Sequence, residues 1–173
     1  MVQFNPLQFG GFNQFVNVNG TLYFGAGTGL WKITGSPETA VLVQDNLTTT
    51  VVANCNGTLY FRANDGASGY ELWKLDGTTP SRVADINPGP AGSNPYGFVP
   101  VGSSVAFITE EGAHGRELWF TGGTGPTTAL VKDINTNTRD FNAGSFLNEA
   151  VNGFIYFFAC LLYTSDAADE GLG

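Results

Sequence analysis

The hexapeptide Asn56-Gly57-Thr58-Leu59-Tyr60-Phe61 repeats, without a single change, the earlier stretch Asn19-Gly20-Thr21-Leu22-Tyr23-Phe24. Looser copies follow as Gly102-Ser103-Ser104-Val105-Ala106-Phe107 and Asn152-Gly153-Phe154-Ile155-Tyr156-Phe157. The glycines at positions 20, 57, 102 and 153 are 37, 45 and 51 residues apart. The chain is therefore built from repeats of a length that holds several short strands.

Two further patterns recur after each of the first three copies. Residues 59–78 align without a gap on residues 105–124, with nine of 20 positions identical, and both segments contain Glu-Leu-Trp. The first copy is shorter and has Gly29-Leu30-Trp31 at this place. A Val-x-Asp tripeptide then ends each unit, at Asp45, Asp85 and Asp133. Because three patterns recur in the same order, the similarity between the units is not a coincidence, and the units are repeats.

Each unit is predicted to contain four strands. In the third copy these are residues 96–101, 104–109, 117–121 and 129–134, separated by turn residues. Leu59, Phe61 and Ala63 alternate with polar or aromatic neighbours, the period of two that is typical of a strand. At the first hairpin of the second copy, Asp65-Gly66 is a preferred dipeptide for a turn in which both residues have positive φ.

These features predict an all-β chain with almost no helix. Repeats of about 40–50 residues with four short strands are typical of β-propellers, so we expect a partial β-propeller of three to four four-stranded antiparallel blades. The repeats are expected at about residues 3–50, 51–95 and 96–145, with an incomplete copy at 146–159.

A four-stranded sheet cannot bury both faces alone, so neighbouring blades have to stack. Large aromatic side chains recur at matching positions and suit this role, because each buries about 150–250 Å². The residues expected to pack the blades are Trp31, Trp73, Trp119, Phe24, Phe61 and Phe107.

The charge balance excludes several classes of partner. Lys and Arg total only seven, they are not clustered, and the net charge is −8. Nucleic acids and anionic membrane surfaces require a basic footprint, so neither is expected as a partner. The longest apolar run, residues 154–163, is about half of the roughly 20 residues that a membrane helix needs.

No catalytic or cofactor pattern stands out, so the candidate residues concern binding. Asp45, Asp85 and Asp133 would form a ring of carboxylates if the blades are radial, and oxygen-rich rings can hold calcium. The favoured alternative is that each carboxylate accepts backbone hydrogen bonds in a turn. Variable hairpins at 66–70 and 112–116 are the candidate ligand loops. Their side chains of interest are Asp65, Tyr70, Glu111, His114 and Arg116.

Residues 71–78, Glu-Leu-Trp-Lys-Leu-Asp-Gly-Thr, resemble the motif of the bacterial ELWxxDGT repeat family. Leu130-Val131-Lys132-Asp133-Ile134-Asn135 is similar to the continuation of that motif, and the resemblance covers roughly residues 3–159. It implies an exported or cell-surface protein, without a defined enzymatic activity or ligand.

Two functions follow as expectations. The first is a non-enzymatic binding or spacing module, with a polysaccharide or a surface protein as partner. The alternative is a propeller that accompanies a hydrolase or another catalytic module outside this stretch of chain.

The C-terminal residues break the repeat pattern. Residues 160–170, Cys-Leu-Leu-Tyr-Thr-Ser-Asp-Ala-Ala-Asp-Glu, resemble the translation of a transposase adapter used in sequencing libraries. Residues 160–173 are therefore expected to be a non-native tail, and residues 1–159 to be the fragment of the propeller.

Overall fold

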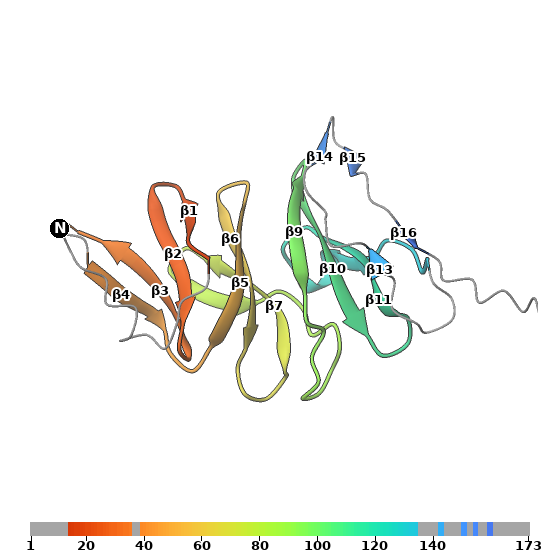
Figure 1. The fold of residues 1–173 in the computed structure, drawn as a ribbon, viewed down its shortest axis with the longest axis horizontal. Helices are drawn as coiled ribbons and strands as arrows, with labels where there is room; N and C mark the ends of the chain where they lie inside the picture. The colour runs from red at the N-terminus through yellow and green to blue at the C-terminus, as the bar shows by residue number, and fades with distance from the viewer. Residues whose placement is uncertain are drawn as a thin grey trace, which may run out of the picture.

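The computed structural model describes residues 14–35 and 39–134, together with the backbone of four short strands further along the chain. Three four-stranded antiparallel sheets follow one another in chain order (Figure 1). Within each sheet the strands lie in the order in which they occur in the sequence, so each sheet is a meander. The all-β prediction is confirmed, and the described residues contain no α-helix.

The strands of the first sheet are β1 (Val16–Val18), β2 (Thr21–Ala26), β3 (Gly29–Thr34) and β4 (Thr39–Gln44). Those of the second sheet are β5 (Thr48–Cys55), β6 (Thr58–Asn64), β7 (Tyr70–Asp76) and β8 (Thr79–Arg82). Those of the third sheet are β9 (Tyr96–Val101), β10 (Ser104–Glu111), β11 (Gly115–Thr121) and β12 (Thr128–Leu130).

Beyond the third sheet, the described backbone consists of four two-residue strands, β13 (Asn142–Ala143), β14 (Ala150–Val151), β15 (Phe154–Ile155) and β16 (Ala159–Cys160). β13 pairs with β16, and β14 pairs with β15. Several expected segments lie outside the described residues. They are the first residues of the first repeat, the remainder of the incomplete fourth repeat, and residues 161–173 of the expected tail.

The alternation expected in β6 is present. Leu59, Phe61 and Ala63 lie in a hydrophobic core that also contains Val18 and Leu30 of the first sheet. Tyr60, which points to the opposite face, lies in a second core with Val105 and Phe107 of the third sheet. The second sheet is thus covered on both faces, because successive side chains along a strand point to opposite sides.

Strand contacts agree with this stacking. β5 contacts β1 and β2 of the first sheet, and β9 of the third sheet contacts β5. The three sheets therefore lie face to face in sequence, as the red-orange, yellow and green ribbons show in Figure 1. None of the described elements is a helix of the length and hydropathy that crossing a membrane requires.

The recurring aromatic residues form cross-strand pairs inside each sheet. Phe24 pairs with Trp31, Phe61 with Trp73 and Phe107 with Trp119. All three phenylalanines are fully buried. Trp73 packs on the core between the first and second sheets, and Trp119 packs on the core between the second and third.

The expected two-residue turn at Asp65-Gly66 is wrong. Gly66 has a positive φ, whereas Asp65 does not, and the loop between β6 and β7 runs from Asp65 to Gly69. The cause is the Asp65 carboxylate, which accepts hydrogen bonds from the N–H groups of Ala67 and Ser68, both at 2.9 Å. Such a side-chain cap holds a wider loop than a two-residue turn.

The last strand of the third sheet is also shorter than expected. It begins at Thr128 and ends at Leu130 rather than at residue 134. One turn of 3-10 helix, Gly125–Thr127, precedes it, and Thr127 Oγ1 accepts the Thr124 N–H at 3.1 Å. The shortening is at the C-terminal end, where the regular ladder with β11 stops at Leu130 and Val131 N–H makes one further bond, to the Leu118 carbonyl oxygen at 2.9 Å.

Candidate functional site

The turns between the first two strands of each sheet lie at the same end of the three-sheet stack. In the first two sheets these turns are Asn19-Gly20 and Asn56-Gly57, and all four residues have positive φ. Asparagine followed by glycine is the preferred pair for such a turn. Asn17 and Asn54 support the turns, because each side-chain oxygen accepts a glycine N–H at 2.9 Å.

The asparagines of these turns also join neighbouring sheets. Asn19 Nδ2 donates to the Gly57 carbonyl oxygen at 3.0 Å, and Asn56 Nδ2 donates to the Gly102 carbonyl oxygen at 2.7 Å. A third bond runs from Asn54 Nδ2 back to the Asn17 carbonyl oxygen at 2.7 Å. The same amide-to-turn contact thus connects the first sheet to the second and the second to the third.

Replacing Asn56 with glycine should remove this contact while keeping the turn, because glycine adopts positive φ without strain. We expect the free energy of unfolding to fall by about 1 kcal/mol, the usual contribution of one hydrogen bond. Asn94→Gly is the control, since Asn94 also has positive φ but its side chain makes only a 3.5 Å contact with the Ala91 carbonyl oxygen in its own loop. Urea unfolding measures both variants, and equal midpoints would show that the bond to Gly102 contributes nothing.

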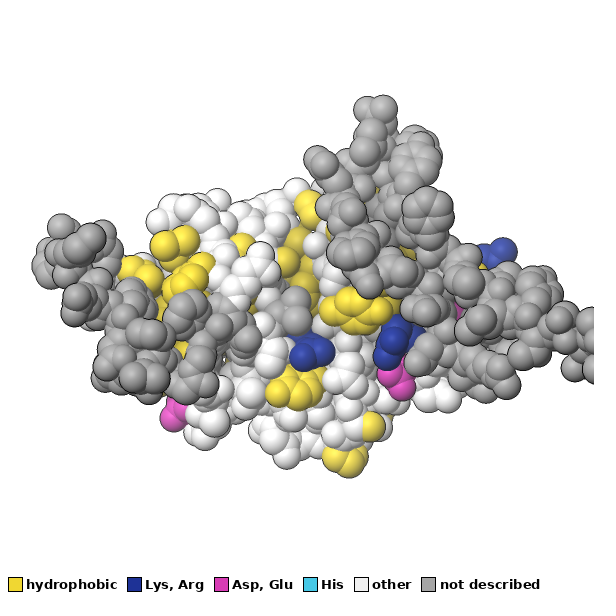
Figure 2. Space-filling view, in the orientation of Figure 1, with side chains coloured by type: hydrophobic (Ala, Val, Ile, Leu, Met, Phe, Trp, Pro, Cys, Tyr) yellow, Lys and Arg dark blue, Asp and Glu magenta, His cyan; other side chains and the backbone are white. Residues whose placement is uncertain are grey.

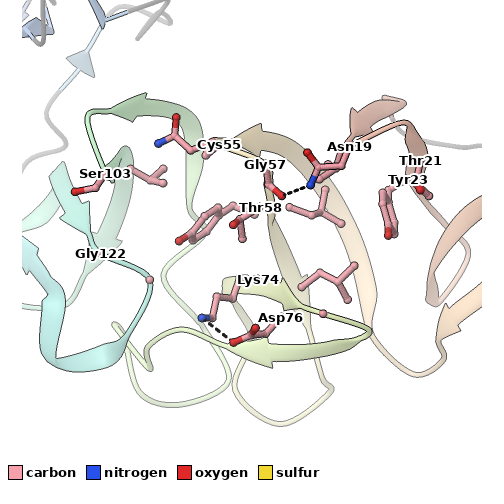
Figure 3. A pocket seen from close by; sticks show the side chains of 18 residues that line it. Asn19, Thr21, Tyr23, Cys55, Gly57, Thr58, Lys74, Asp76, Ser103 and Gly122 are labelled. Atoms are coloured by element: carbon pink, nitrogen blue, oxygen red, sulfur yellow. Dashed lines mark hydrogen bonds and ion pairs between the residues drawn. The ribbon is translucent and has the colours of Figure 1, made fainter.

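A pocket of about 620 Å³ opens beside these turns. It is lined by all three sheets, which is why neighbouring turns surround it in Figure 3. The lining includes residues from each sheet. Among them are Tyr23 from the first sheet, Tyr60, Lys74 and Asp76 from the second, and Ser103 and Gly123 from the third. The volume is within the range of about 300–1,000 Å³ that is usual for small-molecule sites.

Charge in the pocket is confined to one ion pair among the residues that line it. Lys74 Nζ lies 3.1 Å from Asp76 Oδ2, drawn as a dashed line in Figure 3. The lysine side chain is 21% exposed and the aspartate side chain 74%. Because Asp76 is largely in water, this pair contributes little to stability, and both groups can contact a ligand.

Burial changes the acidity of two groups in the pocket wall. It raises the pKa of the Cys55 thiol to about 11. It also raises the pKa of the Tyr60 phenol, and the nearby Cys55 and Asp76 add to that effect. Both groups are therefore neutral at physiological pH, and Cys55 is not a reactive nucleophile because the thiolate is the reactive form.

A second polar cluster lies at the opposite end of the second sheet, where the linker between β8 and β9 crosses it. Glu71 is fully buried, and its carboxylate accepts Ser93 Oγ–H at 2.7 Å, Ile86 N–H at 3.1 Å and Asn87 N–H at 3.2 Å. Glu117 occupies the matching position in β11 and is also fully buried. In the second sheet, the glutamate of the Glu-Leu-Trp motif thus holds a linker.

Ser93 connects this linker to both neighbouring sheets. Its N–H donates to the Tyr70 carbonyl oxygen at 2.9 Å in the second sheet. Its own carbonyl oxygen accepts Glu110 N–H at 2.8 Å and Thr109 Oγ1–H at 2.7 Å from the third sheet. The side chain and both backbone groups of one buried residue are therefore used to fix the second sheet against the third.

Desolvation raises the pKa of Glu71, against the opposing effect of its three hydrogen bonds. A carboxyl whose pKa is raised in the folded state binds its proton more tightly there than in the unfolded chain. Its contribution to stability is therefore present below the unfolded pKa of about 4.3 and is lost as the pH rises through the folded pKa.

As the pH rises through that window, we expect wild type to lose stability relative to Glu71→Gln, which has no proton to release at this position. Other titrating groups cancel in the difference, because both proteins carry them. Urea unfolding at a series of pH values measures it. A difference that stays constant, or that shifts in favour of wild type, would contradict the raised pKa.

The candidate ligand hairpins lie away from the pocket. The loop after β6 is organised by Asp65, whose pKa is lowered by the backbone N–H groups of Ser68 and Ala67. Arg62 lies over the ring of Tyr70, 4.8 Å from its centroid. Neither Asp65 nor Tyr70 lines the pocket, so the structure does not bring these residues together with the cavity.

The corresponding hairpin of the third sheet carries the other three candidates. The His114 ring contacts the Glu111 carboxylate, which also accepts the His114 N–H at 3.0 Å. The Arg116 guanidinium lies 6.0 Å from the centroid of the Tyr96 ring. These contacts are within the third sheet and its hairpin.

The three aspartates at the repeat ends occupy different environments. Asp45 accepts hydrogen bonds from Thr28 Oγ1 at 3.1 Å and from Asn46 N–H at 2.8 Å, which is a turn role. Asp85 lies 3.5 Å from Arg82. One oxygen of Asp133 is buried without a hydrogen-bond partner among the described residues. In the described ranges, no three histidine, cysteine or acidic side chains come together as metal ligands.

The sequence pattern did not identify the pocket. Its Asn-Gly turns were visible as repeats, but Tyr60, Lys74 and Asp76 stand in β6 and β7 with nothing to mark them as a group. The one sequence feature that could have indicated the pocket is the exact copy of the hexapeptide. Identical turns lie at the same end of stacked sheets, and the residues next to these turns line the cavity.

Scans of this chain against protein-family models, curated proteins and solved structures found no match.

Proposed function

We propose that this chain forms successive blades of a β-propeller and acts as a non-enzymatic binding module of an exported or cell-surface bacterial protein. The proposal is carried by one observation, the pocket that all three sheets line beside their equivalent turns. Propellers present ligand contacts on surfaces to which several blades contribute.

The arrangement of the strands supports the blade interpretation. The three sheets have the same meander order, and the first strands of neighbouring sheets contact each other, β1 with β5 and β5 with β9. Contacts between first strands are expected where the first strand of each blade lies nearest a common axis. The resemblance of residues 71–78 to the ELWxxDGT motif supports the same interpretation and the extracellular location.

The surface supports a binding role with neutral partners. Only 13% of the residues are charged, and on the face drawn in Figure 2 the blue and magenta side chains are few beside the white and yellow ones. A polysaccharide or an uncharged patch of a surface protein suits such a surface better than a polyanion does.

The test is retention of the full chain on immobilised partners. A panel of neutral and acidic polysaccharides and of bacterial surface proteins is presented to the folded protein and to urea-unfolded protein. We expect at least one partner to retain the folded chain alone. Retention by no member of the panel would overturn the binding role, and turnover of a retained polysaccharide would favour a catalytic module instead.

A further inference from the structure

Tyr60 is a largely buried residue, only 7% exposed, that lines the pocket, and its hydroxyl is not among the buried polar atoms without a partner. A Cβ added at Gly123 would lie 2.7 Å from this hydroxyl and 4.0 Å from Lys74 Nζ. Within the described part of the chain, no hydrogen bond engages the Tyr60 hydroxyl. Because the hydroxyl makes no hydrogen bond to the described residues and belongs to a residue that lines the cavity, it can donate to or accept from a ligand there.

Two more polar groups lie on the same side of the cavity. Lys74 and Asp76 are two residues apart on β7 and form the ion pair described above. The ammonium has three donors and the carboxylate accepts at two oxygens, so the single contact between them leaves most of their hydrogen-bonding capacity unused.

The charges in this group cancel, which limits the chemistry of the ligand. An anion would lie against Asp76, and a cation would lie against Lys74. An apolar ligand would remove water from all three groups without replacing its hydrogen bonds, at a cost for each group. A neutral ligand with many hydroxyl groups avoids these penalties, because each hydroxyl both donates and accepts.

The rest of the cavity lining also carries hydrogen-bonding groups. Hydroxyl and phenol side chains are part of it, namely Thr21 and Tyr23 from the first sheet, Thr58 from the second and Ser103 from the third, all drawn as sticks in Figure 3. These groups are uncharged and can each donate or accept. The composition of the wall therefore extends the preference for a neutral hydroxyl-rich ligand across the pocket.

We infer that this cavity binds a short neutral oligosaccharide, with Tyr60, Lys74 and Asp76 as its principal polar contacts. The inference rests on the proposed binding function and names its ligand class. The Asp76 carboxylate accepts from a sugar hydroxyl, Lys74 Nζ donates to a neighbouring sugar oxygen, and the Tyr60 hydroxyl pairs with a third. The raised pKa of Tyr60 keeps its phenol protonated.

The experiment titrates the full chain with neutral trisaccharides, namely maltotriose, cellotriose, mannotriose and xylotriose. Trigalacturonate and a neutral tripeptide are the other two arms. Saturation-transfer NMR detects binding, and calorimetry gives the dissociation constants. We expect a neutral trisaccharide to bind, and Tyr60→Phe to weaken it about tenfold, the effect of one lost hydrogen bond to a buried group.

Tyr96→Phe is the matched control, because it removes the same hydroxyl from a tyrosine outside the cavity and outside the candidate ligand hairpins. It should leave the dissociation constant unchanged. Lys74→Met is the second test variant and keeps the aliphatic part of the side chain, so it tests the site even if Tyr60→Phe is poorly folded. We expect it to weaken binding by a similar factor.

Several results would overturn the inference. One is that trigalacturonate or the tripeptide binds more tightly than the neutral trisaccharides. Another is that wild type, Tyr60→Phe and Lys74→Met bind with equal affinity. The third is that no trisaccharide binds. If the panel of immobilised partners still retains the protein in those cases, only the pocket assignment fails. If that panel retains nothing either, the proposed function fails with it.

Discussion

Replacement of Glu71 with alanine is expected to lower the free energy of unfolding by about 3 kcal/mol or more, because buried donors left without an acceptor cost about 1–3 kcal/mol each. Three donors lose their acceptor, the N–H groups of Ile86 and Asn87 and the hydroxyl of Ser93. Urea unfolding followed by tryptophan fluorescence measures the loss.

The matched control is Glu110→Ala, because Glu110 is 44% exposed in its side chain and lies 3.8 Å from Arg116. A surface pair of this kind contributes about 0–1 kcal/mol. Limited proteolysis adds a local readout, since release of the linker should speed cleavage between residues 86 and 94 in Glu71→Ala alone. Equal midpoints for the two variants, with equal cleavage rates, would contradict the anchoring role of Glu71.

The first sheet shows what replaces this anchor when the linker is short. Gly29 stands where the other repeats have glutamate. The chain passes from β4 to β5 through only three residues, and Leu47 N–H donates to the Thr28 carbonyl oxygen at 2.8 Å. A short connection closes with backbone bonds and one side-chain cap at Asp45. In the second sheet, the buried Glu71 therefore accompanies the longer linker, which has more backbone groups to satisfy.

Replacement of Gly92 with alanine should be at least as damaging. A Cβ at this position would lie 2.4 Å from the Tyr70 nitrogen, 2.6 Å from the Tyr70 oxygen and 2.8 Å from the Gly69 carbonyl carbon. All three are backbone atoms, so no side chain can move aside. The linker would have to leave β7 and break the bonds from Ser93 and Asn94 to Tyr70. We expect a loss of about 3 kcal/mol or more.

Gly77→Ala separates this clash from the cost of backbone strain. Gly77 has φ of +61°, close to the +64° of Gly92, but a Cβ there would meet nothing within 4 Å. Its variant should lose only about 1–2 kcal/mol, the cost of a left-handed conformation for a residue with a side chain. Thermal and urea unfolding of the two variants give the difference. Similar losses would show that the close approach of Gly92 to β7 is not tight in solution.

Both predictions concern one contact region, and they bear on the proposed binding site. The linker fixes the second sheet against the third through Ser93, whereas the pocket lies at the other end of the same two sheets. Loosening the linker should therefore weaken ligand binding as well as stability, without removing any group that contacts the ligand.

The class of fold and most of the strands could be predicted from local sequence patterns. Alternation along β6 placed Leu59 and Phe61 on one face and Tyr60 on the other, and the exact Asn-Gly copies marked equivalent turns. These features depend on neighbouring residues, since side-chain alternation and turn conformation are local properties of the chain. At Asp65, where side-chain hydrogen bonds widen the loop, the turn expected from the dipeptide was wrong.

Only the tertiary structure decided which distant groups meet. Glu71 and Ser93 are 22 residues apart, and their hydrogen bond could not be inferred from the motif, which offered the glutamate only as a repeated residue. The pocket likewise depends on how three sheets stack, because Tyr23, Tyr60 and Ser103 come from different sheets. The packing of one sheet on another is set by the complementary shapes of whole faces, which no single stretch of sequence contains.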